Sequence, residues 1–377
     1  MKYYFCVFLL LSTSCISSGN GGENDFDEIS RASAAACAAP FLPKNSVKFV
    51  DFRVDEFDPR HAMSLSRARN GKWIVHILEL ADESSRISSS KAGIESDAQI
   101  QLIRVTREDG KQIFWVLESD EVGGNLVGLD AKGEVKKEFR IATDHFDFRG
   151  SFHGNDALFS MLIEAYSEDK SEVSVLEVAR SAAQKSMLKP TSIAIKPSAI
   201  SVQANEADAA YFFENGELQK WRLMEVGVNG ATRRFENSEW ELASKPTYAA
   251  LNEKHDLVAL VGGDPALGAA TLRVLNTENG SASVEMDLGL AQVFFVRFIK
   301  HLGNEVVAVS KALNGQSIIE FYDIESLKAG TTQVIASSVL DQLNRILIWE
   351  EPSSNSGRMA AWVTSGTEDQ GVKICKM

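Results

Sequence analysis

The sequence predicts an all-β fold built from a repeated unit of about four strands, and three observations support this prediction. The chain beyond residue 45 is a succession of short runs rich in Val, Ile, Phe, Tyr and Trp, bounded by Gly, Asn, Asp and Ser. No long segment shows helical periodicity. Apolar strands with a small central residue recur at spacings of 50, 49, 49 and 53 residues, centred on Ser160, Ala210, Ala259, Ala308 and Ala361. This period is typical of a β-propeller, in which four-stranded blades surround a channel.

Hairpins account for the strands between these repeats. Residues 102–110 and 126–133 alternate apolar and polar side chains and end in Asp-Gly and Lys-Gly, the local chemistry of antiparallel hairpins. Residues 126–139 resemble the quinoprotein-type blade repeat, except that Lys137-Glu138-Phe139 stands where that repeat has a Trp. The repeats are thus weakly quinoprotein-like or WD40-like, without WD40 or kelch signatures. The resemblance implies a propeller architecture and no specific family.

The whole of residues 46–377 is predicted to form a single propeller domain of about seven (six to eight) four-stranded blades. Six blades plus an inserted hairpin fit nearly as well, and a pair of β-sandwiches is the rival fold. From Arg345 onward only three strands are visible, one fewer than a blade needs. Residues 46–52 would supply the fourth from the other end of the chain. Such closure leaves no exposed sheet edge.

The first unit is the least regular part of the predicted ring. The strand around His76 is its counterpart of the recurring strand and lies 84 residues before Ser160, which is one long unit or two short ones. His76 itself is predicted to be a hydrogen-bonded core residue. Residues 82–97 are rich in Ser and charge and are predicted to be a disordered polar loop.

The N-terminus resembles an export signal. Residues 3–11 are an apolar run after Lys2, too short for the roughly 20 residues of a membrane-spanning helix but suited to a signal peptide. Ser12-Thr13-Ser14-Cys15 resembles the lipobox of bacterial lipoproteins, although that family prefers Leu where Ser12 stands. The resemblance implies a signal peptide over residues 1–14 and a lipid anchor on Cys15. It also implies attachment to the bacterial cell envelope. The alternatives are ordinary secretion and no export.

Three further predictions accompany the envelope location. Ile16 is not the Asp that retains some lipoproteins in the inner membrane, which favours the outer membrane, with the body in the periplasm or at the surface. Residues 15–45 are predicted to be a flexible tether that begins with the lipidated Cys. Once Cys6 has left with the signal, Cys37 and Cys375 are the disulfide candidates in an oxidising compartment. The alternative is two unrelated thiols.

The charge balance restricts the class of partner. The chain has 39 Lys and Arg against 52 Asp and Glu, a formal net charge of −13. Nucleic-acid binding draws its affinity from a basic surface, so we expect no nucleic-acid partner. We expect an envelope protein or a glycan as the partner, and a monomeric chain.

Catalytic motifs are absent from the sequence, and one polar cluster is the candidate site. There is no His-Glu-x-x-His, Gly-x-Ser-x-Gly, Cys-x-x-Cys or phosphate loop. On a strand, His145, Asp147 and Arg149 would share one face towards the channel, with His153 close by. The opposite face would hold the aromatic residues Phe146, Phe148 and Phe152. The alternative is an amphipathic inner strand with a solvated face, and no metal or cofactor is predicted.

Two functions fit this pattern. The first is a non-enzymatic, envelope-anchored lipoprotein whose propeller acts as a protein- or glycan-binding or scaffolding module. The second is an exported propeller hydrolase, lactonase-like or sugar-active, with its site near Asp144 to Asp156. The sequence favours the first and leaves enzymatic activity undecided.

Overall fold

Strands form in this chain where apolar and polar residues alternate between tight turns. The antiparallel pair β6 (Gln99–Glu108) and β7 (Lys111–Asp120) is an example. Asp109 and Gly110 join these strands with φ of 48° and 75°, the geometry of a type I′ hairpin turn. The hairpin predicted from the Asp-Gly signal is therefore confirmed.

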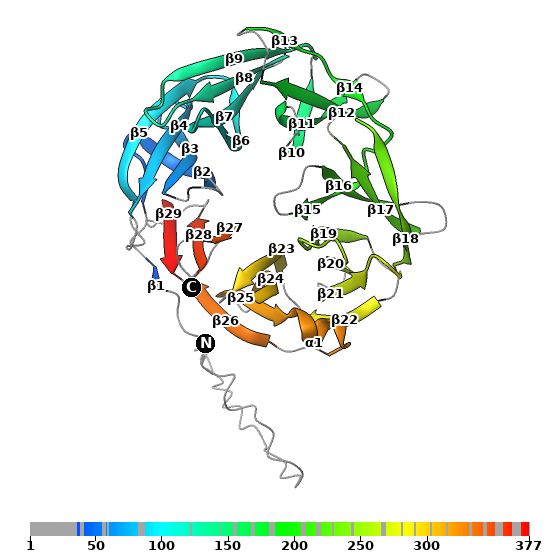
Figure 1. The fold of residues 1–377 in the computed structure, drawn as a ribbon. Coiled ribbons are helices and arrows are strands. Elements are labelled where there is room, and N and C mark those ends of the chain that lie inside the picture. Colours follow the sequence, from blue (N-terminus) through cyan, green and yellow to red (C-terminus); the bar gives the residue numbers. More distant parts are fainter. Residues whose placement is uncertain are drawn as a thin grey trace, which may run out of the picture. The chain divides into compact units, whose positions relative to one another are not determined.

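The computed structural model describes residues 36–37, 41–54, 58, 60–81, 87–120, 123–143, 145–153, 157–166, 170–180, 185–204, 209–215, 220–227, 230–242, 245–264, 269–279, 282–289, 292–301, 304–313, 316–331, 334–341, 345–350, 357–363 and 371–376. All of these lie in one compact unit, residues 33–377. Within the described ranges the strands form six hydrogen-bonded sheets, which follow one another around a ring (Figure 1). The predicted all-β propeller is confirmed.

The first three sheets cover the chain up to Ser192. The first sheet contains β2 (Ser46–Val54), β3 (His61–Ala68), β4 (Trp73–Leu80) and β5 (Ile87–Ser96). The second contains β6, β7, β8 (Gly123–Leu129), β9 (Val135–Ile141) and the two-residue β13 (Met187–Leu188). The third contains β10 (Phe146–Phe152), β11 (Ala157–Tyr166), β12 (Ser171–Ala179) and β14 (Thr191–Ser192).

The other three sheets complete the ring. The largest contains β15 (Ile200–Ala204), β16 (Ala210–Asn215), β17 (Lys220–Val226), β18 (Thr232–Glu241), β19 (Pro246–Leu251), β20 (Leu257–Asp264), β21 (Ala269–Asn276) and β22 (Ala282–Gly289). The next contains β23 (Gln292–His301), β24 (Asn304–Leu313), β25 (Gln316–Asp323) and β26 (Val334–Asp341). The last contains β27 (Arg345–Glu350), β28 (Gly357–Val363), β29 (Gly371–Lys376) and β1 (Ala36–Cys37). Sheets of four, five and eight strands do not by themselves give the predicted count of seven blades.

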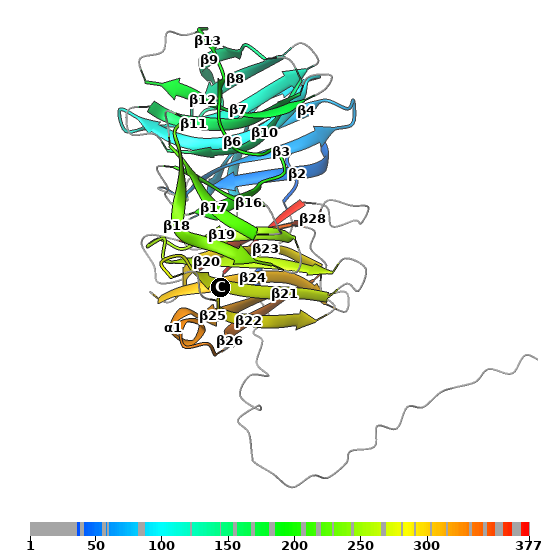
Figure 2. The same ribbon diagram turned by 90° about the vertical axis from the view of Figure 1, so that its right-hand side faces the viewer.

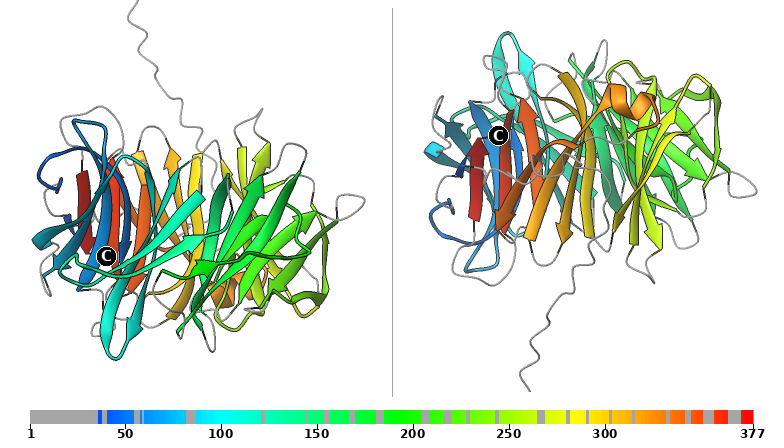
Figure 3. Two further views of the ribbon diagram at one scale, coloured as in Figure 1. Left: turned by 90° about the horizontal axis from the view of Figure 1, so that it is seen from above. Right: turned by 90° about the horizontal axis from the view of Figure 1, so that it is seen from below.

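The first strand of each succession of four antiparallel strands lies towards the centre of the ring. β2 contacts β6 and β27, β10 contacts β6 and β16, and β23 contacts β15, β19 and β27. Figure 1 shows these strands around the centre and β5, β18 and β22 at the rim. Seen from the side, the strands cross the thickness of the ring (Figures 2 and 3). The central strands therefore supply the side chains that line the channel.

The hydrophobic core is divided among the interfaces between neighbouring sheets. One cluster joins Met63 and Val75 of the first sheet to Phe114 and Val116 of the second. In another, Trp115 stacks on Phe139 with ring centroids 5.9 Å apart. Phe139 lies in the segment where the quinoprotein-type repeat has a Trp, and it is fully buried. Face-to-face packing of successive sheets is what closes the ring.

Ring closure uses a different segment from the predicted one. Residues 46–52 belong to β2, which pairs with β3 in the first sheet and is not the missing strand of the last sheet. That strand is β1, whose Ala36 and Cys37 pair antiparallel with Lys376 and Cys375 of β29. Phe41 extends the contact through a bridge to Val372. The described part of the predicted tether thus belongs to the ring, because its backbone completes the edge of β29.

The irregular first unit arises because the counterpart of the recurring strand is β3 and not the predicted strand around His76. His76 lies on β4, the third strand of its sheet, whereas the residues of the repeat lie on second strands. The true counterpart is the buried Ser64 on β3, which precedes Ser160 by 96 residues, two regular intervals. The core position of His76 is confirmed, but its buried Nδ1 makes no hydrogen bond to the described residues, and burial lowers its pKa below the usual value. The predicted loop at 82–97 is wrong over most of its length, because Ile87–Ser96 is the outer strand β5.

Helical structure is limited in the described residues to α1 (Ile324–Lys328), at the rim beside β22 and β25. Asp323 caps its N-terminus by accepting a hydrogen bond from the Ser326 amide at 2.7 Å. In the part of the chain that the structure describes, no helix has the length and apolar character needed to cross a membrane.

Candidate functional site

A cavity of about 280 Å³ opens at the centre of the ring. Its walls come from the central strands β2, β6, β10, β15 and β23, together with β11 and β16. The lining residues are Arg53, Val54, Ile103, Arg104, Val105, Phe148, Arg149, Gly150, Ser151, Phe152, His153, Leu162, Ser201, Val202, Gln203, Ala204, Ala209, Ala210, Tyr211, Phe212 and Arg297. This set contains four arginines and a histidine but no Asp or Glu, although the whole chain has a formal net charge of −13.

The four arginines occupy similar places in four central strands. Arg53, Arg104, Arg149 and Arg297 lie on β2, β6, β10 and β23, each next to large apolar residues such as Phe52. They are separated by 51, 45 and 148 residues, and the last spacing is three repeat intervals. Of these four arginines, only Arg149 belongs to the polar cluster that the sequence predicts as a site. The signal that would have found the others is an Arg inside an apolar strand recurring at the repeat period.

The predicted cluster is only partly brought together. Arg149 and His153 line the cavity, but His145 and Asp147 do not. His145 is exposed with φ of 48° in the bend before β10, and its carbonyl oxygen accepts a hydrogen bond from the Tyr166 amide at 2.9 Å. The prediction that it shares a strand face with Asp147 is wrong, since His145 precedes the strand.

Asp147 is exposed on β10 and pairs with a neighbouring strand. Its Oδ2 accepts a hydrogen bond from the Tyr166 hydroxyl at 2.9 Å. Burial and this hydrogen bond raise the pKa of Tyr166 to about 12. Asp147 is thus an acceptor that holds Tyr166 in its neutral form.

A β-bulge at Arg149 sets the orientation of the cavity wall. Phe148 pairs with Ile163 and Gly150 with Leu162, so Arg149 has no partner in the ladder and the alternation of faces shifts by one residue. Phe148 consequently packs with the cluster around Trp115, whereas Phe152 packs with the opposite cluster around Leu162. The prediction that Phe152 shares a face with Phe146 and Phe148 is therefore wrong.

Arg149 is held by three acceptors. Its Nη2 donates to the carbonyl oxygens of Pro197 at 3.1 Å and Ala199 at 2.9 Å. Its Nη1 lies 3.4 Å from Oε2 of Glu164, whose side chain is 8% exposed. Arg149 therefore compensates a buried carboxylate and ties β10 to the segment that precedes β15.

His153 is held at the cavity by a second arginine. Arg104 Nη2 lies 2.8 Å from His153 Nε2. A guanidinium has only donors, so Nε2 accepts this hydrogen bond and the ring proton resides on Nδ1. The contact crosses from β6 to the end of β10 and orders both side chains at the channel wall.

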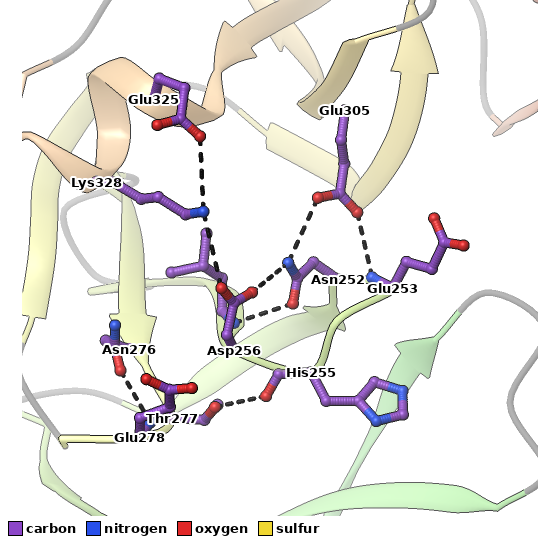
Figure 4. A network of polar contacts seen from close by, with 11 residues as sticks. Asn252, Glu253, His255, Asp256, Asn276, Thr277, Glu278, Glu305, Glu325 and Lys328 are labelled. Carbon is purple, nitrogen blue, oxygen red and sulfur yellow. Dashed lines mark hydrogen bonds and ion pairs between the residues drawn. The ribbon is translucent and has the colours of Figure 1, made fainter.

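A second polar network has a structural role at the turn between β19 and β20 (Figure 4). The buried Asn252 closes the turn between β19 and β20: its Oδ1 accepts from the Leu257 amide at 3.0 Å and its Nδ2 donates to Asp256 at 2.6 Å. Glu305 at the start of β24 accepts from the Glu253 amide at 3.1 Å, and Lys328 of α1 lies 3.7 Å from Asp256. These contacts connect the turn between β19 and β20 to β24 and α1.

Other predicted positions remain without a structural test. Cys15, Asp144 and residues 154–156 lie outside the described residues. Cys37 and Cys375 face each other in backbone register. Across the described ranges, no three His, Cys, Asp or Glu side chains gather as they would around a metal ion.

Comparisons with known proteins identify the architecture. No family model matches the chain and no curated protein matches it. Its fold is similar to the Dos1 propeller, with a TM-score of 0.52 and 10% identity over 90% of this chain and 80% of that one. It is also similar to apo prolyl oligopeptidase B from Galerina marginata, with a TM-score of 0.52 and 9% identity over 85% of this chain but 47% of that one. The C-terminal WD40 domain of Sif2 aligns with a TM-score of 0.49 and 11% identity, covering 91% and 99% of the two chains. At such identities the likeness to the first two shows a propeller fold alone and carries no information about activity.

Proposed function

We propose that this chain is a binding propeller that presents its channel and faces to a partner in the bacterial envelope. The observation that carries the proposal is the convergence of Arg53, Arg104, Arg149 and Arg297 from separate strands on one cavity. A guanidinium stays protonated at neutral pH, so it does not exchange protons as a general acid or base does, but it binds anionic and polar groups. The lining therefore supports recognition more than it supports turnover.

We infer that the ring has seven blades. The eight-stranded sheet reads as two blades, β15–β18 and β19–β22, because only a short parallel contact between β15 and β19 joins its halves. The halves also pack face to face, since Trp221 and Trp240 share a core cluster with Val258 and Leu260. The five-stranded sheet is one blade plus the short β13. An experimental structure in which β15–β22 forms one continuous blade would overturn this count.

The envelope location rests on the lipobox-like Ser12-Thr13-Ser14-Cys15 and the apolar run before it. We expect cleavage before Cys15 and acylation of its thiol, so that the propeller is attached to the outer membrane by lipid. The test is metabolic labelling with an alkyne fatty acid in a bacterial host, followed by membrane fractionation. Wild type should be labelled and membrane-bound, whereas Cys15→Ala should be unlabelled. Equal labelling of Cys6→Ala and wild type is the expected control result, and an unlabelled wild type would refute the anchor.

The partner is expected to be an envelope protein or a glycan, and the chain itself a monomer that binds no nucleic acid. Crosslinking in intact cells followed by affinity purification tests the first expectation, and light scattering tests the second. A substitution pair at the cavity, Arg53→Gln and Arg297→Gln, should weaken recovery of a partner that engages the channel. A chain that turns over a substrate and recovers no partner would sink the proposal.

The second function is the exported hydrolase. What favours it is the imidazole of His153 at the cavity wall, a side chain of the type that most often serves in general acid–base catalysis. Arginines around it would stabilise developing negative charge. Screening lactones and glycosides with wild type, His153→Ala and Asp147→Ala tests this function. Loss of a measured activity in His153→Ala with unchanged folding would establish it, and unchanged activity in both variants would exclude this site.

A further inference from the structure

The central cavity concentrates positive charge in a protein whose overall charge is strongly negative. Arg53, Arg104, Arg149 and Arg297 approach it from four strands, and none of the described residues that line it is acidic. Like charges gathered in a partly dehydrated cavity repel one another, and a bound anion would offset this repulsion. A concave basic site in low-dielectric walls also focuses its field and attracts anions despite an acidic exterior.

Part of this charge is compensated by the protein itself. Glu164 accompanies Arg149 at 3.4 Å, and Asp51 lies 3.8 Å from Arg53 Nε, beyond hydrogen-bond distance. The buried Nε atoms of Arg53 and Arg149 make no hydrogen bond to the described residues. The side chain of Arg53 is 44% exposed, so it can reorient to meet a ligand. The cavity thus keeps donor capacity that the acidic neighbours leave unused.

The size and remaining lining restrict the ligand. A volume of about 280 Å³ is near the lower end of the 300–1,000 Å³ typical of small-molecule sites. Ser201 and Gln203 are exposed on β15 with Val202 buried between them, so they add neutral hydrogen-bonding groups to the wall. Forked guanidinium donors match the paired oxygens of carboxylate and phosphate groups.

We propose that the central cavity binds a small organic anion that carries two or more carboxylate or phosphate groups. This inference rests on the proposed binding function and names its ligand class. Arg53, Arg104 and Arg297 hold the anionic groups, and Arg149 shapes the wall. The oxygens of the ligand replace water around the guanidinium groups, and no bond is made or broken.

Calorimetric titration of the full chain with citrate and with pyrophosphate tests the proposal. KCl at matched ionic strength controls for screening, and sorbitol is the neutral control. We expect saturable binding of one citrate or pyrophosphate per chain and none of sorbitol. The stronger of the two probes identifies carboxylate or phosphate as the preferred group. Absence of saturable binding by both would overturn the proposal.

Matched variants locate the binding. Arg53→Gln and Arg297→Gln should each lower the affinity for the probe at least tenfold. The affinity of Arg53→Lys should fall between those of Arg53→Gln and wild type. Arg233→Gln removes the same charge from the exposed ion pair with Glu225 and should bind like wild type. Thermal unfolding of each variant without ligand checks folding. Unchanged affinity in both cavity variants would overturn the proposal. If the wild-type chain recovers an envelope partner but binds neither citrate nor pyrophosphate, the binding function stands and the anion site alone fails.

Discussion

Arg149 lines the cavity and also stabilises the fold through its contacts with Glu164 and two backbone carbonyls. Arg149→Met keeps an unbranched apolar stem but leaves Glu164 buried without its cation and deprives the carbonyls of Pro197 and Ala199 of a donor. We expect the free energy of unfolding to fall by about 2–3 kcal/mol in urea denaturation. Adding Glu164→Gln to this variant should restore part of the loss, because the orphaned charge is removed. Arg233→Met, at an exposed ion pair, should cost less than about 1 kcal/mol. An equal loss in both variants would contradict this role.

Tyr166 provides a pH prediction at the same scale. Its folded pKa of about 12 exceeds the roughly 10 of an unfolded tyrosine, so the folded chain holds this proton more tightly. The stabilisation is complete below about pH 10 and is lost as the pH rises towards 12. Asp147→Asn removes the acceptor charge and should lower the pKa. The measurement is tyrosinate absorbance, with Tyr166→Phe subtracted to isolate this group. A difference spectrum that already titrates near pH 10 in wild type would refute the prediction.

At the scale of elements, the turn between β19 and β20 depends on Asn252. Asn252→Ala leaves the buried Leu257 amide without its acceptor and breaks the hydrogen bond to Asp256. The expected loss of unfolding free energy is about 1–2 kcal/mol, measured by chemical denaturation. Asn276 accepts from the Glu278 and Asn279 amides in a more exposed turn, so Asn276→Ala is the control and should cost less. A loss in Asn276→Ala as large as that in Asn252→Ala would contradict the structural role of Asn252.

Strand β10 shows where sequence patterning succeeds and where it stops. Alternation predicted Phe146 and Phe148 on one face, and both pack against the same core cluster. It misplaced Phe152, because a one-residue bulge inverts every face beyond it and leaves no local signature in side-chain type. The other cavity arginines were missed for a different reason. Within a single strand an Arg between apolar residues indicates no site, and the shared position of the four arginines appears only when strands one or more repeats apart are superposed.

At the scale of the molecule, the repeat was predictable because packing imposes it. Ser160, Ala259 and Ala308 are fully buried on the second strands of their runs, where a close-packed core favours small side chains. The closure of the ring was not predictable to the residue. β1 is two residues long, so it lacks the alternating run that identifies a strand, and only its pairing with β29 defines it.

That short pairing leads to a prediction about the whole ring. Residues directly opposite in an antiparallel pair have Cα atoms about 4.5–5.5 Å apart, within the range a disulfide spans, and Cys37 is opposite Cys375. Only two residues of β1 pair with β29, so the backbone holds the ring closed weakly at this point. A disulfide between Cys37 and Cys375 would therefore add stability where the backbone contributes little. We expect non-reducing peptide mapping to recover the two cysteines in one linked peptide. Cys37→Ser and Cys375→Ser should each lower the free energy of unfolding by about 2–5 kcal/mol, and the double variant no further. Reductant should lower wild type to the same level and leave the variants unchanged. Ready alkylation of both thiols in the unreduced native chain would show that backbone pairing alone holds the ring closed.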